Sequence, residues 1–138
     1  MRSFIHIRTS KFPILPGERE EIVNPGTYGK SFAQYVQAQL RSRGYRSPCV
    51  CGEDWGWWVE VALPSAAIGL CCYRPSEDDG ETDFVCVPSA LSPRIWSWRR
   101  FRFVDISREL DTLVEDLKAI FASDPDIRLV GVTDDFPL

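Results

Sequence analysis

The alternation of apolar and polar side chains over residues 54–63 restricts the choice of folds more than any other feature of this sequence. Successive side chains of a β-strand point to opposite faces, so one face of such a strand would be almost wholly apolar. That face would carry Trp55, Trp57, Val59, Val61 and Leu63. Pro64 and Ser65 then form a turn short enough to pair this strand with residues 66–73. The pattern therefore predicts an antiparallel sheet with one face buried.

Shorter runs of the same kind predict further strands at residues 3–8, 49–51, 83–87 and 127–132. In the first of these, Ile5 and Ile7 lie on one side, and Phe4, His6 and Arg8 lie on the other. Residues 94–104 are rich in aromatic side chains and follow no single period, so we expect an extended segment there. Residues 11–27 contain prolines and glycines that interrupt both helix and strand, and we expect a surface connection.

Two segments show the spacing of amphipathic helices. In residues 28–43 the apolar side chains recur every three or four positions, and Gly44 follows as a helix terminator. The second segment has a longer stripe, and Pro125 ends it. This stripe consists of Leu110, Leu113, Val114, Leu117, Ile120 and Phe121. Each helix must bury its apolar stripe against another element.

The resulting order, β-α-β-β-β-β-α-β, predicts an α+β domain of two layers, with both helices on one face of a mainly antiparallel sheet. The 138 residues are expected to form one domain, residues 1–138. The sheet face away from the helices would then carry Phe4, His6, Arg8, Trp58, Glu60 and Tyr73. The alternative is that a loop, residues 11–27 or 88–103, covers this face and makes Trp58 part of a second small core.

Charge and length exclude some classes of protein. Twenty acidic and sixteen basic side chains give a net charge of −4, with nine acidic residues in 104–138 and a second cluster between residues 77 and 83. Such a surface attracts basic partners and repels nucleic acid. No apolar stretch approaches the roughly 18 residues needed to cross a bilayer, and the first ten residues lack the apolar block of a secretory signal. We therefore expect a cytoplasmic protein without membrane contact.

The residues typical of catalysis and metal binding are sparse. The five cysteines show no paired Cys-x-x-Cys spacing, so we expect small buried side chains and neither a metal nor another cofactor. His6 is the only histidine, and a pocket on the open sheet face would be lined by His6, Arg8 and Cys71. Glu53 and Asp54 are adjacent carboxylates, but neighbours on a strand point to opposite sides. We therefore assign no catalytic residue.

Residues 94–102 mix arginine with tryptophan, which are also the materials of a platform for single-stranded nucleic acid. The acidic composition, with an isoelectric point near 5.0, argues against that function. We expect these arginines to cap the second helix or to stack on Trp96 and Trp98.

The string Glu53-Asp54-Trp55-Gly56-Trp57, with Tyr28-Gly29 and Gly44-Tyr45 before it, resembles a motif of small bacterial α+β proteins that have no established activity. The likeness covers residues 24–61. It implies a bacterial origin and a compact fold, and it carries no ligand or catalytic residue. In size and acidity the chain is also similar to immunity proteins.

These features together predict a protein-binding module, of the immunity or inhibitor type, that presents acidic and aromatic side chains to a protein partner. The predicted contact residues are Asp54, Trp58, Glu60, Tyr73, Glu77, Asp78, Asp79, Trp96 and Trp98. One alternative is a small enzyme or small-molecule binder with its pocket on the open sheet face. Another is a homodimer that buries its aromatic face across a two-fold axis.

Overall fold

The computed structural model describes residues 3–22, 27–77, 80–90 and 93–138. Its main element is a six-stranded sheet with the order β2-β3-β4-β5-β1-β8, in which every neighbouring pair is antiparallel. These strands are β1 (Phe4–Thr9), β2 (Val50–Glu53), β3 (Gly56–Ala62), β4 (Ala67–Tyr73), β5 (Thr82–Pro88) and β8 (Arg128–Thr133). A separate hairpin is formed by β6 (Arg94–Ser97) and β7 (Arg102–Asp105).

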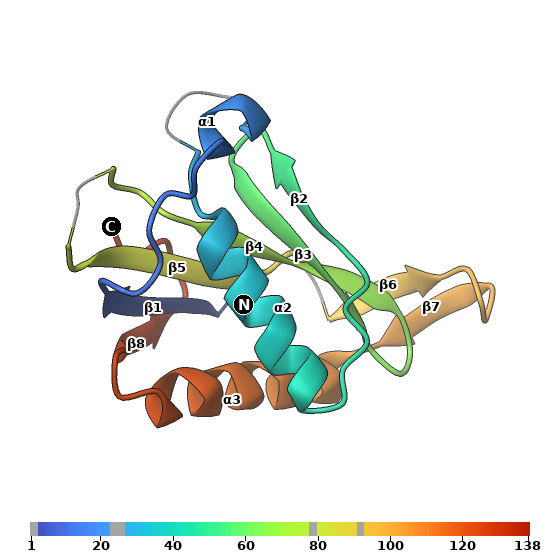
Figure 1. Cartoon of the computed structure of the whole chain (residues 1–138). Helices are drawn as coiled ribbons and strands as arrows, with labels where there is room; N and C mark the ends of the chain where they lie inside the picture. The colour runs from blue at the N-terminus through green and yellow to red at the C-terminus, as the bar shows by residue number, and fades with distance from the viewer. Residues whose placement is uncertain (1–2, 23–26, 78–79, 91–92) are drawn as a thin grey trace.

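The helices are α1 (Glu18–Glu21), α2 (Lys30–Ser42) and α3 (Ser107–Ser123). The two longer helices, α2 and α3, lie on the same side of the six-stranded sheet (Figure 1). The fold is therefore α+β with an antiparallel sheet, and the predicted order of strands and helices is confirmed.

The core lies between the sheet and the two long helices. Phe32 of α2 is fully buried, with its ring centroid 5.1 Å from that of Phe84 on β5 and 6.0 Å from that of Phe121 on α3. Ile5, Ile7 and Leu117 are also fully buried, as their periodicity predicts. The apolar stripes of both helices thus meet one face of the sheet.

The structure adds the short helix α1 and the two strands of a hairpin, β6 and β7, to the predicted order. Residues 18–21 form the short helix α1 within a segment expected to be a connection. Residues 94–105 form a hairpin where a single extended segment was expected. Its turn contains no glycine, proline or asparagine, and Phe101 instead adopts the left-handed conformation with φ of 51°. The usual sequence signal of a turn is therefore missing.

Trp55 was expected on the core face, and this prediction is wrong. Glu53 pairs with Gly56, so Asp54 and Trp55 form the turn between β2 and β3 and precede the alternation of β3. The Trp55 ring is partly exposed and lies 5.3 Å, between centroids, from Tyr73 on the other face.

The prediction that all five cysteines are buried is correct for three of them and wrong for two. Cys71, Cys72 and Cys86 are buried, as expected, whereas Cys49 and Cys51 are exposed at the sheet edge near the carboxylates of Glu60 and Glu53. Partial loss of hydration raises the pKa of both thiols, although both residues are exposed, and the nearby carboxylates of Glu60 and Glu53 raise it further. Neither thiol is therefore activated as a nucleophile.

Candidate functional site: an aromatic hairpin

The hairpin of β6 and β7 projects away from the six-stranded sheet, beyond the turn that joins β3 to β4 (Figure 1). The backbone N–H of Ile106 donates to the Pro93 carbonyl at 2.6 Å and closes the base of the hairpin. Val104 is buried in the main core and Ile95, its pairing partner, packs against that core. One face of the hairpin thus fixes it to the rest of the molecule.

The other face and the turn carry four aromatic side chains that we call the aromatic tip: Trp96, Trp98, Phe101 and Phe103. Trp96 is central, because its ring centroid lies 5.7, 5.3 and 5.2 Å from those of the other three, all edge to face. The three outer rings are 79%, 73% and 57% exposed. Large apolar side chains gathered in this way mark interaction sites more often than isolated ones do.

The charge around the aromatic tip is positive. Residues 94–103 contain four arginines and no acidic residue, and the chain has a net charge of −4, so its other residues sum to −8. The Arg94 guanidinium lies over the Phe103 ring, 5.6 Å from its centroid. Tryptophan, phenylalanine and arginine are enriched in protein interfaces, and arginine and tryptophan in the residues that dominate affinity.

The second surface to consider is the reverse face of the sheet, the face turned away from α2 and α3. A small apolar cluster covers its centre, made of Phe4, Cys71, Val85 and Val87 with Trp58 and Tyr73 packed against it. Phe136 of the C-terminal segment lies over this cluster, 5.9 Å from Phe4 and 5.3 Å from Tyr73 between ring centroids. A second small core therefore exists, and the C-terminal segment covers part of it in place of the loops that were considered.

The pocket residues predicted on the reverse face do not converge. The His6 Nε2 lies 2.7 Å from Asp83 Oδ1, and the Arg8 guanidinium donates to Asp83 Oδ2 at 2.8 Å. Strand β5 separates His6 on β1 from Cys71 on β4, and two strand spacings alone place them at least roughly 9 to 10 Å apart. Cys71 also lies two residues along β4 from Tyr73, the residue in register with His6, which increases the distance. Four hollows described on the surface have linings that do not include His6 or Cys71.

Asp83 remains ionised to lower pH than an ordinary aspartate. Its partial burial opposes ionisation, but the hydrogen bonds from His6 and Arg8 outweigh this effect and lower its pKa. His6, Arg8 and Asp83 thus form a structural hydrogen-bonded cluster between β1 and β5.

The predicted contact residues fall into separate places. Trp96 and Trp98 belong to the aromatic tip, whereas Trp58, Glu60 and Tyr73 are half-buried on the reverse face. Asp54 and Glu77 are exposed at the β2–β3 turn and after β4, and Asp78 and Asp79 lie outside the described residues. Sequence reasoning missed Phe101 and Phe103. The available signal was the spacing of the aromatic residues, which occur two positions apart in residues 96–98 and again in residues 101–103, as on one face of a strand.

Within the described residues, no group of three histidine, cysteine or acidic side chains is placed to hold a metal ion. In the same part of the chain, no helix is long and apolar enough to span a bilayer. A scan against protein-family models, a search of curated proteins and a search of solved structures each found no match.

Proposed function

We propose that this chain is a protein-binding module whose principal anchor is the aromatic tip. The observation that carries the proposal is the exposure of Trp98, Phe101 and Phe103 on one projecting hairpin that the main core holds at its base. Rigid aromatic side chains supply large contact areas at low entropic cost. Their burial by a partner would provide most of the affinity.

The arginines around the tip indicate what the partner must offer. An apolar pocket with an acidic rim would bury the rings and pair with the guanidinium groups of Arg99, Arg100 and Arg102. The acidic remainder of the molecule would repel other acidic surfaces and so favour approach through the hairpin. Neutralisation of an acidic-rimmed site on another protein, as an immunity or inhibitor protein would perform it, fits this arrangement.

The test begins with affinity capture from the host, using the natural chain and the double variant Trp98→Ser/Phe101→Ser. A protein recovered only by the natural chain is then purified and titrated by calorimetry. We expect the double variant to bind it at least thirtyfold more weakly, since truncating a dominant interface residue costs about 2 kcal/mol or more. Phe136→Ser, which removes a ring on the reverse face, is the matched control and should bind normally.

Equal affinity of the double variant and the natural chain would contradict the proposal. So would a preference of the hairpin for another class of molecule, because aromatic and arginine side chains also suit single-stranded nucleic acid and anionic lipid. Fluorescence anisotropy with an RNA oligomer and flotation with vesicles containing phosphatidylserine measure these alternatives. We expect neither to show saturable binding at 150 mM salt.

A further inference from the structure

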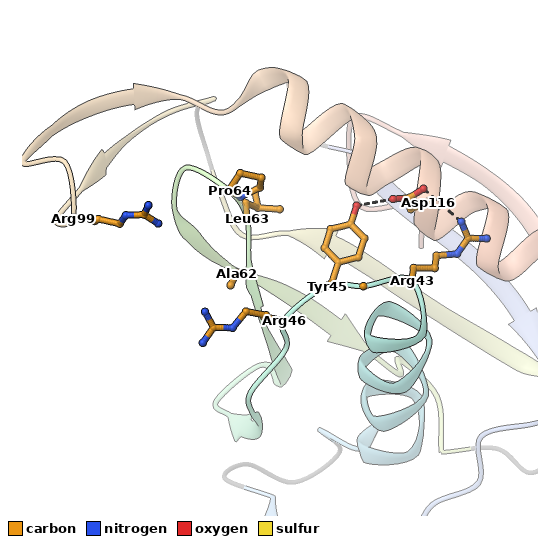
Figure 2. A pocket seen from close by; sticks show the side chains of 9 residues that line it. Arg43, Tyr45, Arg46, Ala62, Leu63, Pro64, Arg99 and Asp116 are labelled. Atoms are coloured by element: carbon orange, nitrogen blue, oxygen red, sulfur yellow. Dashed lines mark hydrogen bonds and ion pairs between the residues drawn. The ribbon is translucent and has the colours of Figure 1, made fainter.

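A hollow of about 460 Å³ lies beside the base of the hairpin, between the end of α2, the β3–β4 turn and the hairpin turn. Three arginines from three different segments line it: Arg43 at the end of α2, Arg46 before β2 and Arg99 in the hairpin turn. Ala62, Leu63 and Pro64 provide an apolar wall (Figure 2). Its volume falls within the range of about 300 to 1,000 Å³ that is usual for small-molecule sites.

The acidic residue in the lining, Asp116 of α3, is already engaged. Tyr45 Oη donates to Asp116 Oδ2 at 2.6 Å, and Arg43 Nη1 lies 3.5 Å from Oδ1 of the same carboxylate. Burial and this hydrogen bond raise the pKa of Tyr45, so the phenol stays protonated as a donor. Asp116 therefore balances Arg43 and leaves the other two arginines of the hollow uncompensated.

Arg46 and Arg99 extend into the space beside Ala62 and Pro64, while Arg43 turns toward Asp116 (Figure 2). Among the described residues, neither Arg46 nor Arg99 forms an ion pair with a carboxylate. The position of Arg46 is fixed, because its carbonyl accepts a hydrogen bond of 2.8 Å from the backbone N–H of Ala62. Two positive groups gathered in one hollow favour an anion from outside the chain.

We propose that this hollow binds a small phosphorylated molecule, with Arg46 and Arg99 holding the phosphate and the wall of Ala62 and Pro64 contacting the organic part. Guanidinium groups pair with phosphate through two parallel hydrogen bonds, which gives such sites both strength and orientation. The apolar wall has no role in binding a bare ion, so it favours a ligand with a carbon skeleton. The hollow shares Arg99 with the proposed interface, but its other lining residues lie outside the hairpin, and the inference does not depend on the proposed function.

The proposal is tested by titrating the full chain with inorganic phosphate and with adenosine monophosphate. Two-dimensional NMR spectra record the backbone amides and the Nε–H signals of the arginines. We expect saturable shifts confined to Arg46, Arg99 and their neighbours, and tighter binding of the nucleotide than of phosphate alone. Adenosine, which lacks the phosphate, should give no saturable shift.

Variants identify the groups that bind. Arg46→Gln and Arg99→Gln should each weaken binding at least tenfold, and circular dichroism should show an unchanged fold because both side chains are exposed. Arg128→Gln is the matched control, since Arg128 is an exposed arginine of β8 outside the hollow.

Three results would overturn the proposal: no saturable binding of either phosphate compound, equal binding by the glutamine variants, or succinate binding as tightly as phosphate. The last result would show a carboxylate site in place of a phosphate site.

Discussion

At the scale of single residues, Glu18 shows how an interior charge organises the chain. It is 1% exposed, and its carboxylate accepts hydrogen bonds from the backbone N–H groups of Leu15, Gly29 and Lys30 at 3.0, 2.8 and 3.2 Å. The last two groups belong to the start of α2, where a helix lacks internal acceptors and attracts negative charge. Glu18 therefore joins α1 to the first turn of α2.

Replacing Glu18 with glutamine should destabilise the fold. One carboxylate oxygen becomes an amide donor that faces backbone donors, and the attraction to the helix start is lost. We expect the free energy of unfolding to fall by about 1 to 3 kcal/mol in urea denaturation. Glu20→Gln, at an exposed position of the same short helix, is the control and should change it by less than about 0.5 kcal/mol. Equal stability of the two variants would refute this role of Glu18.

Asp83 predicts how stability depends on pH. Because its pKa is lowered in the folded state, its contribution is complete above the unfolded carboxyl value of about 3.9 and disappears as the pH falls through the lowered value. Asp83→Asn should therefore lower stability at pH 7 by about 1 to 3 kcal/mol and show a smaller deficit at pH 2.5. Thermal unfolding across that range measures the difference. A deficit independent of pH would contradict the assignment, and Asp134→Asn serves as the exposed control.

At the scale of elements, the pairing of β3 with β4 depends on a glycine. A Cβ atom built on Gly69 would lie 2.1 Å from Cζ2 of Trp58, because the indole lies directly against the backbone of β4. Glu60 pairs with Gly69 in the same ladder, so a larger residue would disturb the centre of this pair of strands. Trp58 gains its partial burial from this close approach.

Gly69→Ala should displace the Trp58 ring and lower the free energy of unfolding by about 1 to 3 kcal/mol, the usual cost of overpacking. Gly131→Ala on β8 is the matched control, because a Cβ there would meet no atom within 4 Å. Chemical denaturation gives both values, and the aromatic proton shifts of Trp58 report the displacement. A Gly69→Ala variant as stable as the control would show that the indole moves aside freely.

The hairpin illustrates a conflict between local backbone preference and the proposed function. Phe101 holds a left-handed backbone with φ of 51°, where glycine is favoured, and yet its ring is 73% exposed. Phe101→Gly should therefore leave the stability unchanged or raise it by about 1 kcal/mol. In the same variant, we expect binding of the proposed partner to weaken at least tenfold. Thermal unfolding and calorimetry separate the two effects, and a loss of stability would show that the ring supports the hairpin.

The helices, strands and turns differ in how well the sequence predicts them. The helices and the long strands follow from their periodicity, since Phe32 and Leu117 of the helices and Val59 and Val61 of β3 are all buried. The hairpin was missed because its turn is made of Trp98, Arg99, Arg100 and Phe101, none of which is a typical turn residue. The prediction for Trp55 was wrong because the alternation of apolar and polar residues continues through the β2–β3 turn. Only the pairing of Glu53 with Gly56 shows where that turn lies.

The site was harder to foresee than the fold. Trp96 and Trp98 were singled out from the composition of their segment, but the exposure of Trp98 depends on how the hairpin leaves the sheet (Figure 1). The hollow beside it joins residues 43, 46 and 99, whose proximity arises only from tertiary packing. Sequence spacing contains no record of such a contact.

At the scale of the whole molecule, charge is divided between a basic hairpin and an acidic remainder. This division predicts that the proposed partner associates more slowly as salt is added. We expect the association rate constant to fall about tenfold or more between 10 and 300 mM salt, with little change in dissociation. Stopped-flow fluorescence measures both rates. Arg100→Glu/Arg102→Glu should abolish most of the salt dependence, and an unchanged dependence would mean that encounter occurs elsewhere.

The attachment of the hairpin by only one of its faces has an evolutionary consequence. The exposed rings of Trp98, Phe101 and Phe103 do not belong to the core between the sheet and the helices, so we expect selection to replace them at little cost to folding. Lineages that meet different targets are free to exchange these side chains while the scaffold stays constant. The same property makes the loop a natural point for grafting a new specificity.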